Sequence, residues 1–143
     1  MQLMKVLVDS SVWIDHLRGV RSRETATFDA LLALLDPQGD PDGGLTLVVG
    51  DLVLCEVLRG IADPRQHAAV RKVMLGFDLV TIGGVDLALE AADHYRSLRR
   101  LGITVRKTID LLIGTWCIVE NCDLLHSDRD FDPMVQHLGL RTL

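Results

Sequence analysis

The chain has 143 residues, 48% of them hydrophobic, which suffices for the core of one domain over residues 1–143 and is too little for two. No run of about eighteen apolar residues is present to cross a membrane, and the N-terminal segment lacks the regions of a signal peptide, so we expect a cytoplasmic protein. The net charge of −5 argues against binding of nucleic acid through a broad basic surface, because neutralising phosphates requires an excess of lysine and arginine.

The first half of the chain predicts two buried strands, each followed by helical patterns. The first apolar run ends at Asp9-Ser10-Ser11, where a serine can cap the helix that follows. A stretch with two prolines and three glycines separates the two units and predicts a loop. The expected elements are a strand at 3–8, helices through Leu17 and over 23–35, a loop at 36–44, a strand at 45–49, and a helix from Asp51 to Gly60.

The second half alternates strands and helices in the same way. Its longest helix shows apolar residues at helical spacing and ends at Gly102. The expected elements are helices at 64–75, 85–101, 108–120 and 132–138, strands at 79–82 and 123–126, and a last edge strand at 140–143. This alternation predicts an α/β fold with a central, mostly parallel β-sheet and helices on both faces, because parallel strands need crossover connections.

Acidic residues stand where such a fold places ligands, beyond the carboxyl ends of the strands. Asp9 and Asp128 each follow a predicted strand, so both belong to one edge of the sheet. Glu56 and Asp110 lie in very apolar helices. Each has a structural alternative: Asp9 can cap a helix, Asp110 can complement a helix dipole, and Glu56 can pair with Arg59 one turn on.

Taken together, the four acids favour a metal site. Carboxylates gathered in apolar surroundings repel one another unless a hard divalent cation lies among them. Ligation by oxygen alone suits Mg²⁺ or Mn²⁺ better than zinc. Such a site can hydrolyse a nucleic-acid strand without a side-chain nucleophile, and the number of ions, one or two, stays open.

Four short motifs then stand in order along nearly the whole chain: Asp9-Ser10-Ser11-Val12-Trp13-Ile14-Asp15, Cys55-Glu56-Val57-Leu58-Arg59-Gly60, Ile109-Asp110-Leu111-Leu112-Ile113, and Leu125-His126-Ser127-Asp128-Arg129-Asp130-Phe131. In this order they resemble the PIN-domain ribonucleases, in particular the VapC-like toxins of type II toxin–antitoxin systems. The resemblance implies an Mg²⁺- or Mn²⁺-dependent endoribonuclease, often a homodimer, that a small antitoxin protein inhibits. It also implies that the metal-binding and catalytic acids are Asp9, Glu56, Asp110 and Asp128, with Ser11 at the small polar position after the first acid.

The last motif departs from the family pattern. His126 stands where many relatives carry threonine, and we expect a structural histidine that is hydrogen-bonded to the site. Asp130 and Asp132 follow Asp128 closely and are accessory candidates, although capping of the next helix equally explains Asp132.

Three other interpretations compete with a ribonuclease. A calcium loop at residues 128–139 is excluded, because Pro133 and Gly139 stand where that loop needs glycine and glutamate. An aspartyl phosphotransferase expects a second aspartate where Ser11 stands. The serious alternative is a non-catalytic PIN-fold module that binds RNA or protein, and its function would not depend on a divalent metal.

Two further surfaces are candidates for contact with partners. Trp13, Leu17 and the helix over residues 28–35 carry enough apolar surface to border an antitoxin groove, and plain core packing explains them equally well. A local basic rim for RNA has two candidate patches: Arg18, Arg21 and Arg23, and Arg96, Arg99, Arg100, Arg106 and Lys107.

Overall fold

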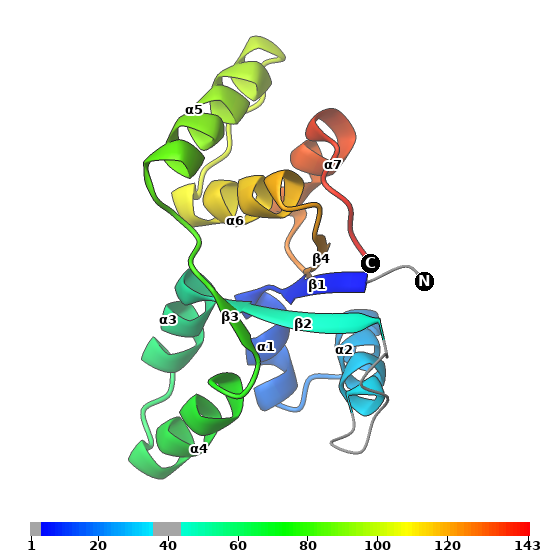
Figure 1. Cartoon of the computed structure of the whole chain (residues 1–143), viewed down its shortest axis with the longest axis vertical. Helices are drawn as coiled ribbons and strands as arrows, with labels where there is room; N and C mark the ends of the chain where they lie inside the picture. Colours follow the sequence, from blue (N-terminus) through cyan, green and yellow to red (C-terminus); the bar gives the residue numbers. More distant parts are fainter. Residues whose placement is uncertain (1–3, 36–43) are drawn as a thin grey trace.

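A computed structural model describes residues 4–35 and 44–143 (Figure 1). Strands and helices alternate along these residues. In chain order the elements are β1 (Met4–Val8), α1 (Ser10–Leu17), α2 (Arg23–Leu34), β2 (Leu45–Gly50), α3 (Asp51–Arg59), α4 (Pro64–Met74), β3 (Asp78–Val80), α5 (Val85–Arg100), α6 (Thr108–Val119), β4 (Asp123–Leu125), the 3₁₀ turn η1 (Arg129–Phe131) and α7 (Asp132–Leu138).

The four strands form one parallel sheet in the order β3-β2-β1-β4. β1 lies in the middle, where Val6 pairs with Leu47 of β2 and with Asp123 of β4. Figure 1 shows α1 to α4 on one side of the sheet and α5 to α7 on the other. The predicted α/β fold is therefore confirmed, and all four carboxyl ends lie at one edge.

The two central strands are apolar at successive positions because both faces of the sheet are covered. Val6, Leu7 and Val8 of β1 are almost completely buried, as are Val48 and Val49 of β2. This arrangement explains why their sequences show no alternation of apolar and polar residues. This buried pair of strands therefore ends directly below the edge of the sheet where the acids are expected.

Two tight strand-to-helix junctions build that edge. A single residue, Asp9, separates β1 from α1, and α3 begins directly after Gly50, the last residue of β2. A Cβ atom on Gly50 would lie 2.2 Å from Cδ1 of the buried Ile82, so a larger residue would require the Ile82 side chain to shift. The junction packs closely against Ile82 at the point where α3, which carries Glu56, begins.

The structure corrects three expectations. Residues 140–143 form no edge strand, because Thr142 makes only an isolated bridge to Leu124. The strand expected at 79–82 ends at Val80, and the N–H of Ile82 donates instead to the Asp51 side chain at 2.7 Å. η1 was not expected. Of the predicted loop at 36–44, residues 36–43 lie outside the described residues.

Among the helices the structure describes, none has the length and hydropathy needed to span a membrane.

Candidate active site

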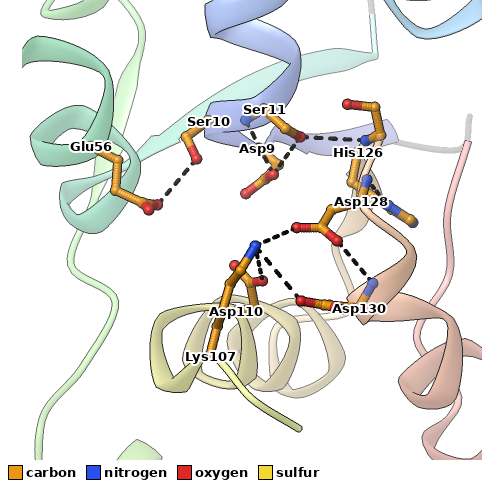
Figure 2. A network of polar contacts seen from close by, with 10 residues as sticks. Asp9, Ser10, Ser11, Glu56, Lys107, Asp110, His126, Asp128 and Asp130 are labelled. Carbon is orange, nitrogen blue, oxygen red and sulfur yellow. Dashed lines mark hydrogen bonds and ion pairs between the residues drawn. The ribbon is translucent and has the colours of Figure 1, made fainter. Parts of the chain in front are cut away.

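The four predicted acids come from four parts of the chain and lie at the carboxyl edge of the sheet (Figure 2). Asp9 follows β1 and Asp128 follows β4. α6 presents Asp110 from its first turn, and α3 carries Glu56 on the opposite side. Figure 2 shows the carboxylates directed toward a common space, so the structure brings together residues up to 119 positions apart, from Asp9 to Asp128.

One carboxylate oxygen of Asp9 accepts hydrogen bonds, and the other has no hydrogen-bond partner. Its Oδ2 accepts hydrogen bonds from the N–H of Ser11 at 3.2 Å and from the hydroxyl of Ser11 at 2.6 Å. This makes Asp9 the N-cap of α1, as the structural alternative predicted. The other oxygen, Oδ1, is buried with no hydrogen-bond partner, in a residue only 2% exposed. Capping of α1 therefore explains the position of Oδ2 but not that of Oδ1. Burial raises the pKa of Asp9.

Two neighbouring serines orient the acids. The Ser11 hydroxyl that holds Asp9 also accepts from the N–H of Ser127 at 3.4 Å, which links the end of β1 to the loop after β4. The Ser10 hydroxyl donates to Oε1 of Glu56 at 3.1 Å. Ser10 is thus a contributor that sequence reasoning missed. In the described part of the chain, Glu56 makes no ion pair with Arg59, so that alternative was wrong.

Asp110 is the second buried acid of the site. The residue is 6% exposed, and its Oδ2 is buried without a hydrogen-bond partner. Burial raises the pKa of Asp110 to about 7, with further raising by the charges of Asp9, Asp128 and Glu56, while Lys107 acts in the opposite direction. With a pKa of about 7, Asp110 is partly protonated at neutral pH, and a cation beside it would favour the ionised form.

Asp128 and Asp130 complete the acidic group. One oxygen from each of Asp110, Asp128 and Asp130 lies within 4.8 Å of the other two. Asp128 accepts from the N–H of Asp130 at 2.9 Å. Burial acts to raise the pKa of Asp128, but this hydrogen bond and the Lys107 ammonium outweigh burial and lower it. Asp130, expected only as an accessory residue, is therefore a full member of the group.

Asp132 does not cap the next helix. It is the first residue of α7, whose N-cap is Phe131 with no side-chain cap hydrogen bond, so the capping explanation was wrong. Its side chain is exposed and stands outside the acidic group.

Lys107, a candidate for the basic rim, lies beside the acidic group. Its Nζ lies 2.9 Å from Oδ2 of Asp128, 3.6 Å from Oδ2 of Asp130 and 3.9 Å from Oδ2 of Asp110. The hydrogen bond to Asp128 and the charge of Asp128 raise the pKa of Lys107. Its side chain is 59% exposed, as a residue of the basic rim would be. The signal available in the sequence was its position three residues before Asp110, which puts both on one side of α6.

His126 has the structural role expected of it. Its Nδ1 accepts the N–H of Asp128 at 3.2 Å, and its ring packs on Phe131 with the centroids 4.8 Å apart. The histidine therefore holds the backbone of the loop that carries Asp128.

The residues present fit a hard divalent cation. Asp9 Oδ1 and Asp110 Oδ2 are buried oxygens that need a partner, and a buried unpaired carboxylate oxygen is costly. The surrounding donors are carboxylates, with no thiolate near them in the described acidic group, which suits Mg²⁺ or Mn²⁺.

The family model of the PIN domain matches residues 6–134, and the chain therefore belongs to the PIN-domain family. Within that family it is similar to Ribonuclease VapC11 of Mycobacterium tuberculosis and to VapC ribonuclease Mb1587 of Mycobacterium bovis. Each is 25% identical over 136 residues, which cover 95% of this chain and 96% of the relative. The resemblance seen in the four motifs is confirmed.

Solved structures show the same fold. The chain is similar to a chain of VapBC2 from Rickettsia felis bound to a promoter DNA fragment, with a TM-score of 0.73 and 14% identity, covering 98% of both chains. It is also similar to a chain of VapBC-1 from nontypeable Haemophilus influenzae, with a TM-score of 0.69 and 16% identity, covering 98% of this chain and 97% of the other.

The strain at Asp110 predicts a pH dependence of stability. A carboxyl whose pKa rises on folding binds its proton more tightly in the folded state, so stability falls as the pH rises from the ordinary value of 3.8 to about 7. In chelator, we expect the free energy of unfolding to drop by about 2 kcal/mol between about pH 5 and pH 8. Asp110→Asn should flatten this part of the curve and be more stable than wild type at the higher pH.

Urea denaturation at a series of pH values measures this difference. The comparison with the variant removes the contribution of every other group, because those groups are present in both proteins. Parallel curves for wild type and Asp110→Asn would contradict the assignment of strain to Asp110.

Proposed function

We propose that this protein is a metal-dependent endoribonuclease and the toxin of a toxin–antitoxin pair, carried by one PIN domain that we place at residues 1–143. The observation that carries the proposal is the pair of buried carboxylate oxygens without hydrogen-bond partners, Asp9 Oδ1 and Asp110 Oδ2, at the ligand-binding edge of a parallel sheet. The names of the relatives, which are VapC ribonucleases, support RNA as the substrate.

Asp9, Asp110 and Asp128 would hold Mg²⁺ or Mn²⁺, with Glu56 facing them and Asp130 beside Asp128. When bound, the cation supplies the acid chemistry of phosphodiester hydrolysis, because it polarises the phosphoryl group and makes water a stronger nucleophile at neutral pH. No side-chain nucleophile is required, and none is proposed.

The chain's own residues prepare these ligands. Ser11 fixes Asp9 through Oδ2, so that Oδ1 stays directed into the site. Ser10, the residue before Ser11, holds Glu56 in the same way, through a hydrogen bond from its hydroxyl. Asp110, whose pKa is raised to about 7, would lose its carboxyl proton on binding a cation, so cation binding should strengthen with pH up to about 7.

The substrate proposal is consistent with the charge of the chain. A protein of net charge −5 gains little from long-range attraction to RNA and depends on substrate shape and on local basic groups. A cytoplasmic location and a homodimer remain predictions that go with this function.

An apolar groove supports the antitoxin part of the proposal. A cavity of about 240 Å³ opens between α1, α2 and α4. Its lining is almost entirely apolar and consists of Trp13, His16, Leu17, Leu32, Ala69, Val70, Val73 and Phe77. An amphipathic helix of a partner protein binds in such grooves through its apolar face. Solved structures similar in fold include VapBC-1 of Haemophilus influenzae and a toxin–antitoxin complex from Klebsiella pneumoniae, which supports an antitoxin as the occupant.

The two residues predicted to contact the antitoxin differ in role. Trp13 is 4% exposed and packs edge-on against Phe28 and Phe77, with centroids 4.8 and 5.6 Å away, so it belongs chiefly to the core. Leu17 is half-buried and lines the groove. Val73 of α4 lines the same groove and is 56% exposed, which makes it the better residue to test.

The ribonuclease proposal predicts discrete cleavage of RNA by the purified, antitoxin-free protein with Mg²⁺ or Mn²⁺. Asp9→Asn should lose at least about a hundredfold in rate, because it weakens a proposed ligand directly. Chelator should abolish cleavage. Asp93→Asn, which removes an exposed carboxylate from α5, is the matched control and should cleave like wild type.

Gel analysis of a total RNA pool reads out all four samples. A folded protein that cut no RNA with either metal, yet still bound its antitoxin, would favour the non-catalytic binding module. Equal cutting by wild type and Asp9→Asn would point to a contaminating nuclease and against the proposed site.

The antitoxin proposal predicts that Val73→Asp weakens binding of the cognate antitoxin by at least about tenfold, since it places a charge in an apolar interface. Its thermal stability should stay near wild type because the side chain is already exposed. Leu89→Asp, at an exposed position of α5 outside this groove, is the control. Calorimetric titration with the antitoxin measures both, and equal affinities would move the antitoxin to another surface.

A further inference from the structure

We infer that Lys107 is a tethered cation that occupies the acidic group in the metal-free protein and is exchanged for the divalent cation when one binds. The inference rests on the proposed function, because it concerns the same site. It assigns to a residue outside the four family acids a part in controlling when the site is loaded.

The first step is the position of the ammonium. Nζ of Lys107 lies within 4 Å of one oxygen from each of three carboxylates, those of Asp110, Asp128 and Asp130 (Figure 2). One oxygen from each of these residues also lies within 4.8 Å of the others, which is the spacing that could hold a metal ion. The lysine therefore stands in the one group of metal-competent acids found among the described residues.

The second step is what the ammonium leaves undone. It hydrogen-bonds Asp128, at 2.9 Å, and lies 3.6 Å from Asp130, and these are the two more exposed acids of the group. It lies 3.9 Å from Asp110 Oδ2, which remains buried without a hydrogen-bond partner, as does Asp9 Oδ1. Lys107 thus neutralises the more exposed acids of the site, while the buried oxygens of Asp9 and Asp110 still lack a cation.

The third step is that the two cations compete. Mg²⁺ binds its ligand oxygens at about 2.0–2.1 Å and is usually held directly by one or two carboxylates. An ammonium that stays hydrogen-bonded to the same oxygens would lie within a few ångströms of the ion, and like charges at that separation repel strongly. Occupation by the metal therefore requires that Lys107 withdraw from the group.

The fourth step is that withdrawal is cheap. Lys107 is the N-cap residue of α6, and its side chain is 59% exposed. Its flexible four-carbon stem can turn to solvent without disturbing the core. In the ranges the structure describes, its ion pairs are confined to the three acids. An ammonium held this way reduces the repulsion among the carboxylates when no metal is bound. A metal ion that also contacts the buried oxygens can displace it.

The experiment is a titration of Mn²⁺ into the antitoxin-free protein, followed by the electron paramagnetic resonance signal of free Mn²⁺. Lys107→Met should bind Mn²⁺ about three- to fivefold more tightly than wild type, the size expected from removing a partly exposed ion pair. Lys107→Arg keeps the charge and should stay near wild type. Arg106→Met removes the same charge from the neighbouring, exposed residue and controls for net charge.

Unchanged or weaker Mn²⁺ binding by Lys107→Met would overturn the inference, as would equal tightening in Arg106→Met. A folded wild-type protein that bound no Mn²⁺ would overturn the proposed function as well, so the two failures are distinguishable. Should Lys107→Met fail to fold, the unmutated protein decides: the side-chain NMR signal of Lys107 should move toward that of a free lysine when Mg²⁺ saturates the site. A signal that did not move would overturn the exchange.

Discussion

The structure depends on one electrostatic constraint: carboxylates from four segments lie close together at the edge of a parallel sheet, and two of them, those of Asp9 and Asp110, are buried. Asp9 and Asp110 are each less than a tenth exposed and each has an oxygen with no hydrogen-bond partner. Burial raises the pKa of both, and at Asp110 the charges of Asp9, Asp128 and Glu56 raise it further. Such strain is tolerated where function requires it, and here a cation would relieve it. The serine hydroxyls and the lysine contact the carboxylates directly, and the histidine holds the backbone at Asp128.

The fold supplies the rigidity that this constraint needs. β1 is paired on both sides, and the N–H of Asp9 donates to the carbonyl of Leu125 at 2.9 Å, which joins the first acid to the strand that precedes Asp128. Gly50 lets α3 leave β2 without a linking residue. A site assembled from helix ends and strand ends of a close-packed sheet keeps its ligands aimed even when they repel one another.

The sequence was enough to predict the alternating architecture and the place of Asp9 and Asp128 after the ends of two strands, because apolar runs and the residues that follow them are local signals. It could not place Lys107, whose partners lie three and more than twenty residues away, or the Ser10–Glu56 hydrogen bond across 46 residues. Trp13 appeared equally fit for groove or core until Phe28 and Phe77 were seen to enclose it. These relations arise from tertiary packing, which no local pattern encodes.

The most direct test of the account is a crystal of the antitoxin-free protein soaked in Mn²⁺, with an anomalous difference map calculated at a wavelength where manganese scatters anomalously. The account predicts a peak within bonding distance of Asp9 Oδ1 and Asp110 Oδ2, with the Lys107 ammonium moved away from Asp128. No peak there, with both buried oxygens satisfied by water or by neighbouring side chains, would contradict the claim that this edge of the sheet is a metal site.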